Sequence, residues 1–219
     1  MKFLFDLGGV FFDWDPNHFF KDVFDKEDER IHFLTEVCND DWNIQQDAGR
    51  TIEEAEFELI PKFPHYEKEI KMYYKNHRKM IRGTFNTSIK VLDKLKGQNY
   101  ECYVLSNWSA ETFIGMVDDY PFLKLFDGLL ISGEDKLMKP DAAIYELAIN
   151  RFKLIPNETI FIDVIEEIPL RPEVDRSYFR LMLLGSMAWT LVWYDPNGAY
   201  SPKQTAKEMV DLFRYSCGA

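Results

Sequence analysis

The segment KFLFDLGGV, residues 2–10, sets the expectation for the fold. It begins as a short apolar run at Lys2–Phe5, reaches an acidic residue at Asp6, and then turns through Gly8 and Gly9. Such a run, bounded by turn residues, is typical of a strand. In open α/β sheets, ligands bind outside the carboxyl ends of the strands. Asp6 is therefore the first candidate functional residue.

Similar apolar runs recur along the chain and alternate with segments of helical periodicity. The runs are Glu101–Leu105, Gly128–Ile131, Thr159–Ile162 and Trp189–Trp193. The predicted helices are Ser88–Lys96, Ala110–Asp118, Asp141–Phe152 and Asp175–Leu184. Strands alternating with helices predict βαβ units. The fold class is therefore α/β, with a Rossmann-like, doubly wound parallel sheet.

Residues 16–82 interrupt this alternation. They are dense in charged and aromatic residues, carry helical periodicity and contain no convincing strand. We predict an all-helical insert after the first strand, and a core domain formed by residues 1–15 and 83–219.

Composition excludes several classes of protein. The 219 residues include 26 Lys and Arg against 37 Asp and Glu, which gives a net charge of −11 and argues against a nucleic-acid partner. No apolar run approaches the ~20 residues that a membrane span needs. The three cysteines lack metal-ligand spacing and are expected to be free thiols. We expect a globular cytoplasmic protein, either monomeric or homodimeric, without a membrane partner.

Polar residues follow the other predicted strands, as Asp6 follows the first. Ser106 and Asn107 follow the second, Lys139 lies in the loop after the third, and Asp163 follows the fourth. Because the carboxyl ends of parallel strands meet at one edge of the sheet, we expect these side chains to converge on one crevice.

These segments resemble the four motifs of the haloacid dehalogenase-like hydrolases, in order and spacing. The matching stretches are FDLGGV at 5–10, VLSN at 104–107, KPDAAIY at 139–145 and FID at 161–163. The resemblance covers residues 1–163 and resumes weakly at Met187–Asp195. The insert resembles the family's cap of the type placed after the first motif (the C1 cap). The first two motifs look closest to the glucose-1-phosphatase-like branch and the phosphatase domain of soluble epoxide hydrolases.

The resemblance implies a phosphatase that uses Asp6 as nucleophile and forms an aspartyl phosphate. It also implies a Mg²⁺ ion held by the Asp6 carboxylate, the Gly8 carbonyl and Asp163. A transferring phosphoryl group needs cations and fixed donors around its oxygens. Lys139 offers an ammonium that pairs with Asp6 and phosphate, and Ser106 a hydroxyl. The amides of Asn107 and Trp108 are further candidates to bind the phosphate.

The chain departs from the family pattern at two motifs. The usual second aspartate of the first motif, which protonates the leaving group, is replaced by Gly8. Asp13 and Asp15 are candidate substitutes, or solvated acids at the junction with the insert. After Asp163 the usual second acid is missing, and Glu167 is a candidate to replace it as a metal ligand. The residues from Ile165 to Ser186 do not read like the family.

The cap is expected to select the substrate. Trp42, Asp47, Gly49 and Arg50 form a string that resembles a cap element of the same branch, and Arg50 either contacts the substrate or forms a surface salt bridge. We therefore predict a Mg²⁺-dependent phosphomonoester hydrolase for a small phosphorylated metabolite such as a sugar phosphate. The alternatives are a metal-independent 2-haloacid dehalogenase and a catalytically weak phosphate-binding protein on the same scaffold.

Overall fold

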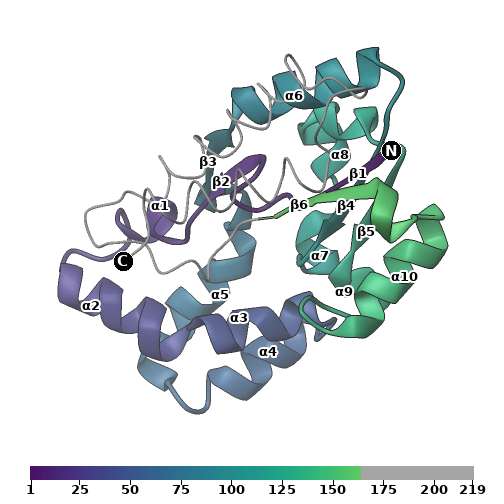
Figure 1. The fold of residues 1–219 in the computed structure, drawn as a ribbon. Helices are drawn as coiled ribbons and strands as arrows, with labels where there is room; N and C mark the ends of the chain where they lie inside the picture. Colours follow the sequence, from purple (N-terminus) through teal and green to yellow (C-terminus); the bar gives the residue numbers. More distant parts are fainter. Residues whose placement is uncertain (164–219) are drawn as a thin grey trace, which may run out of the picture. The chain divides into compact units, whose positions relative to one another are not determined.

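A computed structural model describes residues 1–163, which form one compact unit. Four parallel strands lie side by side in the order β5–β4–β1–β6 (Figure 1). They are β1 (Lys2–Phe5), β4 (Glu101–Ser106), β5 (Gly128–Ile131) and β6 (Thr159–Ile162). These strands lie where the sequence predicted them, and the α/β parallel sheet is confirmed. Their near-continuous apolar runs fit a sheet that is covered on both faces.

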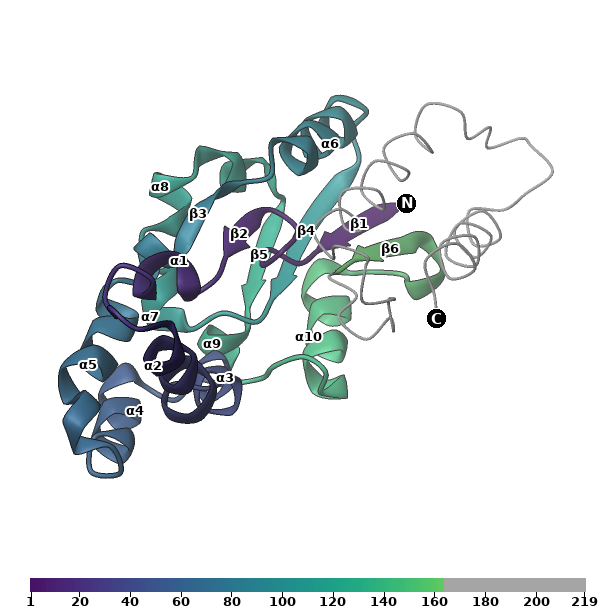
Figure 2. The same ribbon diagram turned by 90° about the vertical axis from the view of Figure 1, so that its left-hand side faces the viewer.

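Two long helices cover the sheet from opposite sides (Figures 1 and 2). The chain leaves β1 through α6 (Asn86–Gly97) toward β4, and returns from β5 through α10 (Ala142–Phe152) to β6, on the other side of β1. Since parallel crossovers are right-handed, connections that run in opposite directions place their helices on opposite faces. The sheet is therefore doubly wound.

The face under α10 has an aliphatic and aromatic core. It consists of Leu4, Tyr103, Leu105, Leu130, Ile144, Ala148, Phe152 and Leu154. On the opposite face the rings of Phe5, Phe11 and Phe126 pack edge to face, with centroids 5.5 to 5.8 Å apart. Edge-to-face aromatic pairs each add about 0.5–1.5 kcal/mol beyond the burial itself. The two faces together fix β1, which carries Asp6 at its end.

Short helices fill the remaining connections. They are α7 (Ala110–Phe113), α8 (Met116–Asp119), η4 (Pro121–Leu125), α9 (Ser132–Asp135) and η5 (Pro156–Glu158). The single helix predicted over Ala110–Asp118 is wrong: Gly115 adopts φ +82° and divides it into α7 and α8. The predicted N-cap Asp141 is confirmed, because its carboxylate accepts from the Ala143 amide at 3.1 Å.

The helical segment after β1 is flanked by a two-stranded antiparallel ribbon, β2 (Phe12–Trp14) and β3 (Ile81–Thr84). Between them lie α1 (Asn17–Phe20), α2 (Glu27–His32), η1 (Phe33–Val37), α3 (Asp40–Asp47), α4 (Ile52–Leu59), η2 (Pro64–Tyr66), α5 (Glu67–Lys75) and η3 (His77–Met80). The sequence did not predict the ribbon, whose strands are too short to show a period. It carries the chain out to the helices and back.

The helices between β2 and β3, called the cap below, have a hydrophobic core of their own. Phe20, Phe33, Trp42, Ile70 and Tyr73 are among its buried residues. Helix α4 begins with a capping box, in which the Thr51 hydroxyl accepts from the Glu54 amide and the Glu54 carboxylate accepts from the Thr51 amide. The helical character predicted for this segment is therefore supported by packing as well as by local sequence.

Several predicted features lie outside the described residues. They are the helix at Asp175–Leu184, the strand at Trp189–Trp193, the metal ligand Glu167 and the predicted continuation of the core to residue 219. Among residues 1–163, no helix is both long and apolar enough to cross a membrane.

Gly133 in α9 allows two backbones to meet at the end of the sheet, and we expect Gly133→Ala to be strongly destabilising. A Cβ there would overlap the Ala110 nitrogen and lie 2.8 Å from the Trp108 carbonyl oxygen. Overpacking against backbone costs about 1–3 kcal/mol. Gly97→Ala is the matched control, since its Cβ would meet nothing within 4 Å. Urea unfolding should show a lower free energy of unfolding for Gly133→Ala alone, and equal values would contradict this view of the packing.

Candidate active site

The carboxyl ends of three adjacent strands bring the predicted residues together (Figure 2). Asp6 follows β1, Ser106 ends β4 and Asp163 follows β6. β1 lies between the other two, and Phe5 is paired with both Val104 and Ile162. The chain leads from β1 toward β4 and returns from β5 to β6 on the other side of β1, and open α/β sheets form a ligand crevice where the strand order reverses in this way.

Lys139 joins the two carboxylates of this edge. Its ammonium lies 2.7 Å from Asp163 Oδ2 and 3.3 Å from Asp6 Oδ1. The side chains of Lys139 and Asp6 are only 11% and 12% exposed, so water screens the Lys139–Asp6 pair weakly. Both carboxylates raise the pKa of Lys139 despite its burial, and it remains a cation at neutral pH. Residues more than 150 positions apart in the chain thus form one charged centre.

Asn107 holds Lys139 in place. Its side-chain nitrogen donates to the Lys139 carbonyl at 2.9 Å, and its side-chain oxygen accepts from the Lys139 amide at 2.8 Å. Two hydrogen bonds between one side chain and one backbone unit fix both position and direction. The Asn107 side chain therefore positions the lysine.

Trp108 is engaged differently from the sequence expectation. Its amide donates to Ser132 Oγ at 2.9 Å, which ties the loop after β4 to α9, instead of facing the crevice as a phosphate donor. Its indole ring packs against Phe12, His77 and Phe113. In this structure Trp108 supports the loop that carries Asn107.

The Asp6 carboxyl group is buried beneath these residues. Burial raises its pKa to about 6, Lys139 lowers it, Asp163 raises it, and the nearby Ser106 hydroxyl lowers it. Within residues 1–163, Asp6 Oδ1 is buried with the 3.3 Å ion contact to Lys139 but no hydrogen bond of good geometry, and Ser106 Oγ is buried without one. Buried oxygens left in this state fit a site that completes itself with a ligand.

The residues fit a magnesium site of few protein ligands. Mg²⁺ prefers oxygen donors and usually retains several waters. Asp6 and Asp163 supply two carboxylates at one edge, and within the described part of the chain a Cβ at Gly8 would meet nothing within 4 Å. No cluster of three or more His, Cys, Asp or Glu side chains suited to a metal is found among residues 1–163.

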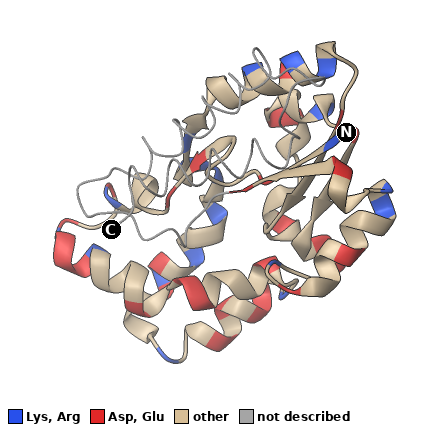
Figure 3. Cartoon of the chain, viewed as in Figure 1, with Lys and Arg blue, Asp and Glu red and all other residues tan. Residues whose placement is uncertain are grey.

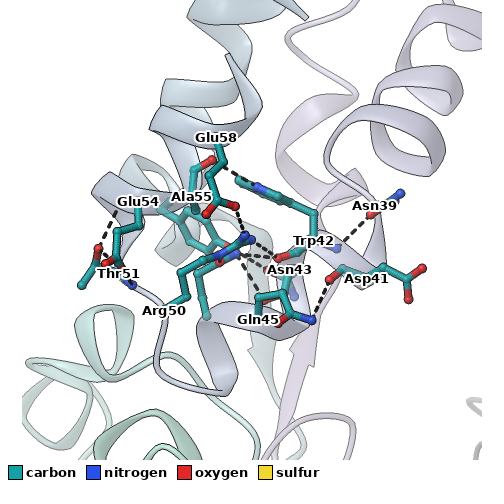
Figure 4. Close-up of polar contacts among 12 residues, drawn as sticks. Asn39, Asp41, Trp42, Asn43, Gln45, Arg50, Thr51, Glu54, Ala55 and Glu58 are labelled. Carbon is teal, nitrogen blue, oxygen red and sulfur yellow. Dashed lines mark hydrogen bonds and ion pairs between the residues drawn. The ribbon is translucent and has the colours of Figure 1, made fainter. Parts of the chain in front are cut away.

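Arg50 belongs to a network inside the cap (Figure 4). Its guanidinium donates to Gln46 Oε1 at 2.7 Å, to Glu58 Oε2 at 2.6 Å and to the Trp42 carbonyl at 3.0 Å. Of the two alternatives that the sequence offered for Arg50, the salt bridge is present, and its partner is Glu58. A contact between Arg50 and a substrate stays a prediction.

Asp47 is the residue near the crevice that sequence reasoning left without a role. It ends α3, and α3 contacts α9 of the core. The Ser109 amide and the charge of Asp6 both influence its pKa, which places the carboxyl group close to the loop after β4. The sequence analysis did single out Asp47, as part of the string that resembles a cap element of the family. A sequence pattern does not give the direction of a side chain, so no role could be assigned from it.

Charged residues of both signs occur throughout the described part of the chain. Figure 3 shows acidic and basic residues interspersed, with acidic residues frequent along α3 and α4 of the cap. These include Asp40, Asp41, Glu53, Glu54, Glu56 and Glu58. An anionic substrate must therefore be attracted locally, and Lys139 is the cation placed to do so.

Comparisons with known proteins agree with this geometry. The model of the haloacid dehalogenase-like hydrolase family matches residues 4–163. The chain is 24% identical over 160 residues to the sesquiterpene phosphatase astK of Aspergillus oryzae, which covers 73% of this chain and 78% of that protein. Over 80 residues it is 29% identical to (S)-2-haloacid dehalogenase 4A of Burkholderia cepacia, covering 36% of this chain and 35% of that protein.

Two further matches concern the fold and the end of the chain. The magnesium complex of a HAD family enzyme from Bacteroides thetaiotaomicron has a TM-score of 0.59 at 22% identity, covering 84% of this chain and 89% of that one. The model of the tetracyclin repressor-like C-terminal domain matches residues 158–216. The segment that did not read like the hydrolases therefore resembles a different family.

We expect Asp6→Asn to stabilise the metal-free protein. The folded-state pKa of Asp6 is raised from 3.8 to about 6, so its stabilising protonated form is present at low pH and is lost as pH rises through that range. At pH 8 the variant should gain up to about 3 kcal/mol in free energy of unfolding, and the gain should vanish near pH 3.

Urea unfolding in EDTA at several pH values measures this difference. Asp93→Asn, an exposed acid on α6, is the control and should change stability little at any pH. A gain that does not depend on pH would contradict the assignment of the effect to ionisation of Asp6.

Proposed function

Because the chain belongs to the haloacid dehalogenase-like hydrolase family, we propose that it hydrolyses small organic phosphate monoesters, such as sugar phosphates, with Asp6 as nucleophile and Mg²⁺ as cofactor. The observation that carries this proposal is the pair of ion contacts from Lys139 to Asp6 and Asp163. A carboxylate nucleophile beside a fixed cation suits the transfer of an anionic phosphoryl group.

In the proposed reaction an Asp6 oxygen attacks phosphorus, and the bond from phosphorus to the ester oxygen breaks. Lys139 balances the negative charge of the phosphoryl oxygens, and the Ser106 hydroxyl donates to one of them. Water then attacks the aspartyl phosphate, which releases inorganic phosphate and restores the carboxylate. Division of one displacement into two steps is the advantage of a covalent intermediate.

Asp6, the Gly8 carbonyl and Asp163 are the groups proposed to hold Mg²⁺, with Glu167 as a further candidate outside the described residues. When bound, the ion would neutralise phosphoryl charge. The magnesium complex of the structural neighbour supports this choice of metal. The chain's own contribution is to hold two carboxylates at one strand edge with a lysine between them.

The dehalogenase alternative has one favourable observation in the partial likeness to (S)-2-haloacid dehalogenase 4A. In that reaction the same aspartate would attack carbon and displace halide without a metal. Asp163 favours the phosphatase, because a second carboxylate at the edge of β6 is useful for a divalent cation and of no use to a departing halide. The likeness to a phosphatase also extends over twice the length, 160 residues against 80.

Phosphate release in the presence of Mg²⁺ tests the proposal. We expect a panel of phosphate monoesters to include substrates, activity to disappear in EDTA, and Asp6→Asn to lower the rate by at least about 10³-fold because the nucleophile is gone. Asp93→Asn serves as the control and should behave as the parent protein.

Other outcomes point to the alternatives. Halide release from 2-haloacids that persists in EDTA, without phosphate release, would identify a dehalogenase. Capture of beryllium fluoride with Mg²⁺ but no hydrolysis across the panel would identify a binding protein. Full phosphatase activity in Asp6→Asn would exclude the mechanism.

A further inference from the structure

The proposed reaction needs a proton that the first motif does not supply. An alkoxide is a poor leaving group, and loss of a general acid typically costs about 10²–10⁴-fold in rate. The family's usual acid two residues after the nucleophile is replaced by Gly8. Among residues 1–163, no atom lies within 4 Å of a Cβ built at Gly8, so this part of the chain leaves room for a side chain to start there.

The acids closest in sequence to the first motif are committed elsewhere. Asp13 Oδ2 lies 2.6 Å from the Arg82 guanidinium, and its Oδ1 lies 3.2 Å from His18 Nε2. Asp15 accepts from the Asn17 amide at 2.7 Å and from the Asn17 side chain at 2.9 Å. These contacts hold the β2–β3 ribbon and the start of α1, so neither side chain is placed to act on an ester oxygen.

Asp47 is the last residue of α3 in the cap, and its interaction with the Ser109 amide places its carboxyl group beside the loop after β4. The loop that follows it is seated on the core: a Cβ at Gly49 would lie 2.7 Å from Lys136 Cγ and 3.3 Å from the Gly133 carbonyl oxygen. A few residues on, the Ile52 amide donates to Glu111 Oε1 at 2.7 Å. Two independent contacts therefore fix the α3–α4 loop against α9 and α7, the segments that follow β5 and β4.

From this geometry we propose that the carboxyl group of Asp47 is the general acid of the reaction. This inference rests on the proposed phosphatase function. As the bond from phosphorus to the ester oxygen breaks, the Asp47 proton passes to that oxygen, which leaves as an alcohol. The Asp47 carboxylate then takes a proton from the water that attacks the aspartyl phosphate, so both protons are accounted for and the carboxyl group is restored.

The electrostatics of Asp47 suit this exchange. Burial raises its pKa to about 7, the Ser109 amide lowers it, and the charge of Asp6 raises it. A catalytic acid works best when its pKa is close to the working pH, since both forms are then populated. The other titratable groups around it are Tyr73 and Tyr74 of α5, with Lys136, Glu111 and Arg50 beside the loop that follows.

Arg50 fixes the end of the helix that carries Asp47. Its three hydrogen bonds, to Gln46, Glu58 and the Trp42 carbonyl, join the end of α3 to α4 (Figure 4). The Gln46 side-chain nitrogen in turn donates to the Trp42 carbonyl at 2.8 Å. These bonds hold in place the end of α3, whose last residue is Asp47.

The test compares esters with poor and good leaving groups. We expect Asp47→Asn to lower phosphate release from an alkyl phosphate by about 10²–10⁴-fold. The loss with p-nitrophenyl phosphate should be at least about tenfold smaller, because p-nitrophenolate departs without a proton. We expect the activity of the parent protein toward the alkyl ester to decline above about pH 7, because Asp47 then loses its proton. This decline should be absent in Asp47→Asn.

Gly8→Asp combined with Asp47→Asn provides a rescue. A Cβ at position 8 would meet no described atom within 4 Å, so an aspartate can be placed there. By supplying an acid near the same oxygen, it should raise the alkyl-ester activity at least about tenfold above that of Asp47→Asn alone. Asp41→Asn, an exposed acid on the same helix, is the matched control and should leave both rates unchanged. Thermal unfolding of each variant confirms that the fold is retained.

The outcomes separate the two levels of inference. An active parent protein whose Asp47→Asn variant loses equal activity toward both esters, with an unchanged pH profile and no rescue, would overturn the role of Asp47 and leave the phosphatase standing. No phosphate release by the parent protein from any ester would overturn both. A leaving-group-dependent loss with rescue supports the proton donor.

Discussion

The structure around the crevice depends on one ammonium held between two carboxylates. Lys139 reaches Asp6 and Asp163 from a loop, and Asn107 holds its backbone through two hydrogen bonds. Ionised Asp6 is destabilised by burial, so the lysine allows a nucleophile to exist where water is excluded. The same burial makes the pair effective, because charges interact more strongly away from water. The ionised carboxylate that can act as a nucleophile therefore lowers the free energy of unfolding of the protein.

Close backbone contacts hold the supporting loops in register. Gly133 lies against the Trp108 carbonyl, and Gly49 of the cap lies against the Gly133 carbonyl. Three segments that are distant in sequence thus meet where only small residues fit. The cap loop therefore lies against the same turn that supports the loop after β4. In the proposed reaction these contacts are what keep Asp47 beside that loop.

The sequence predicted those features that depend on local pattern. Buried strands, the N-cap at Asp141 and the convergence of Asp6, Ser106, Lys139 and Asp163 follow from apolar runs and from the rule that parallel strands end at one edge. The β2–β3 ribbon was missed because three or four residues show no period. The division of α7 from α8 was missed because it depends on the φ of Gly115. The bonding of Trp108 to Ser132 and the direction of Asp47 depend on tertiary packing, which no local pattern encodes.

The positions of the acids explain why a proton donor from the cap is consistent with the rest of the site. Gly8 and Val164 stand in the sequence where the family pattern usually has acids, and among residues 1–163 the contacts at the strand edge join two carboxylates to one lysine. Fewer fixed negative charges weaken the hold on a divalent cation and reduce repulsion of an anionic ester. An acid that is neutral when the ester binds and negative only after its proton has left adds no repulsion at the binding step. A carboxyl group on the cap whose pKa is raised by burial to about 7 has this property.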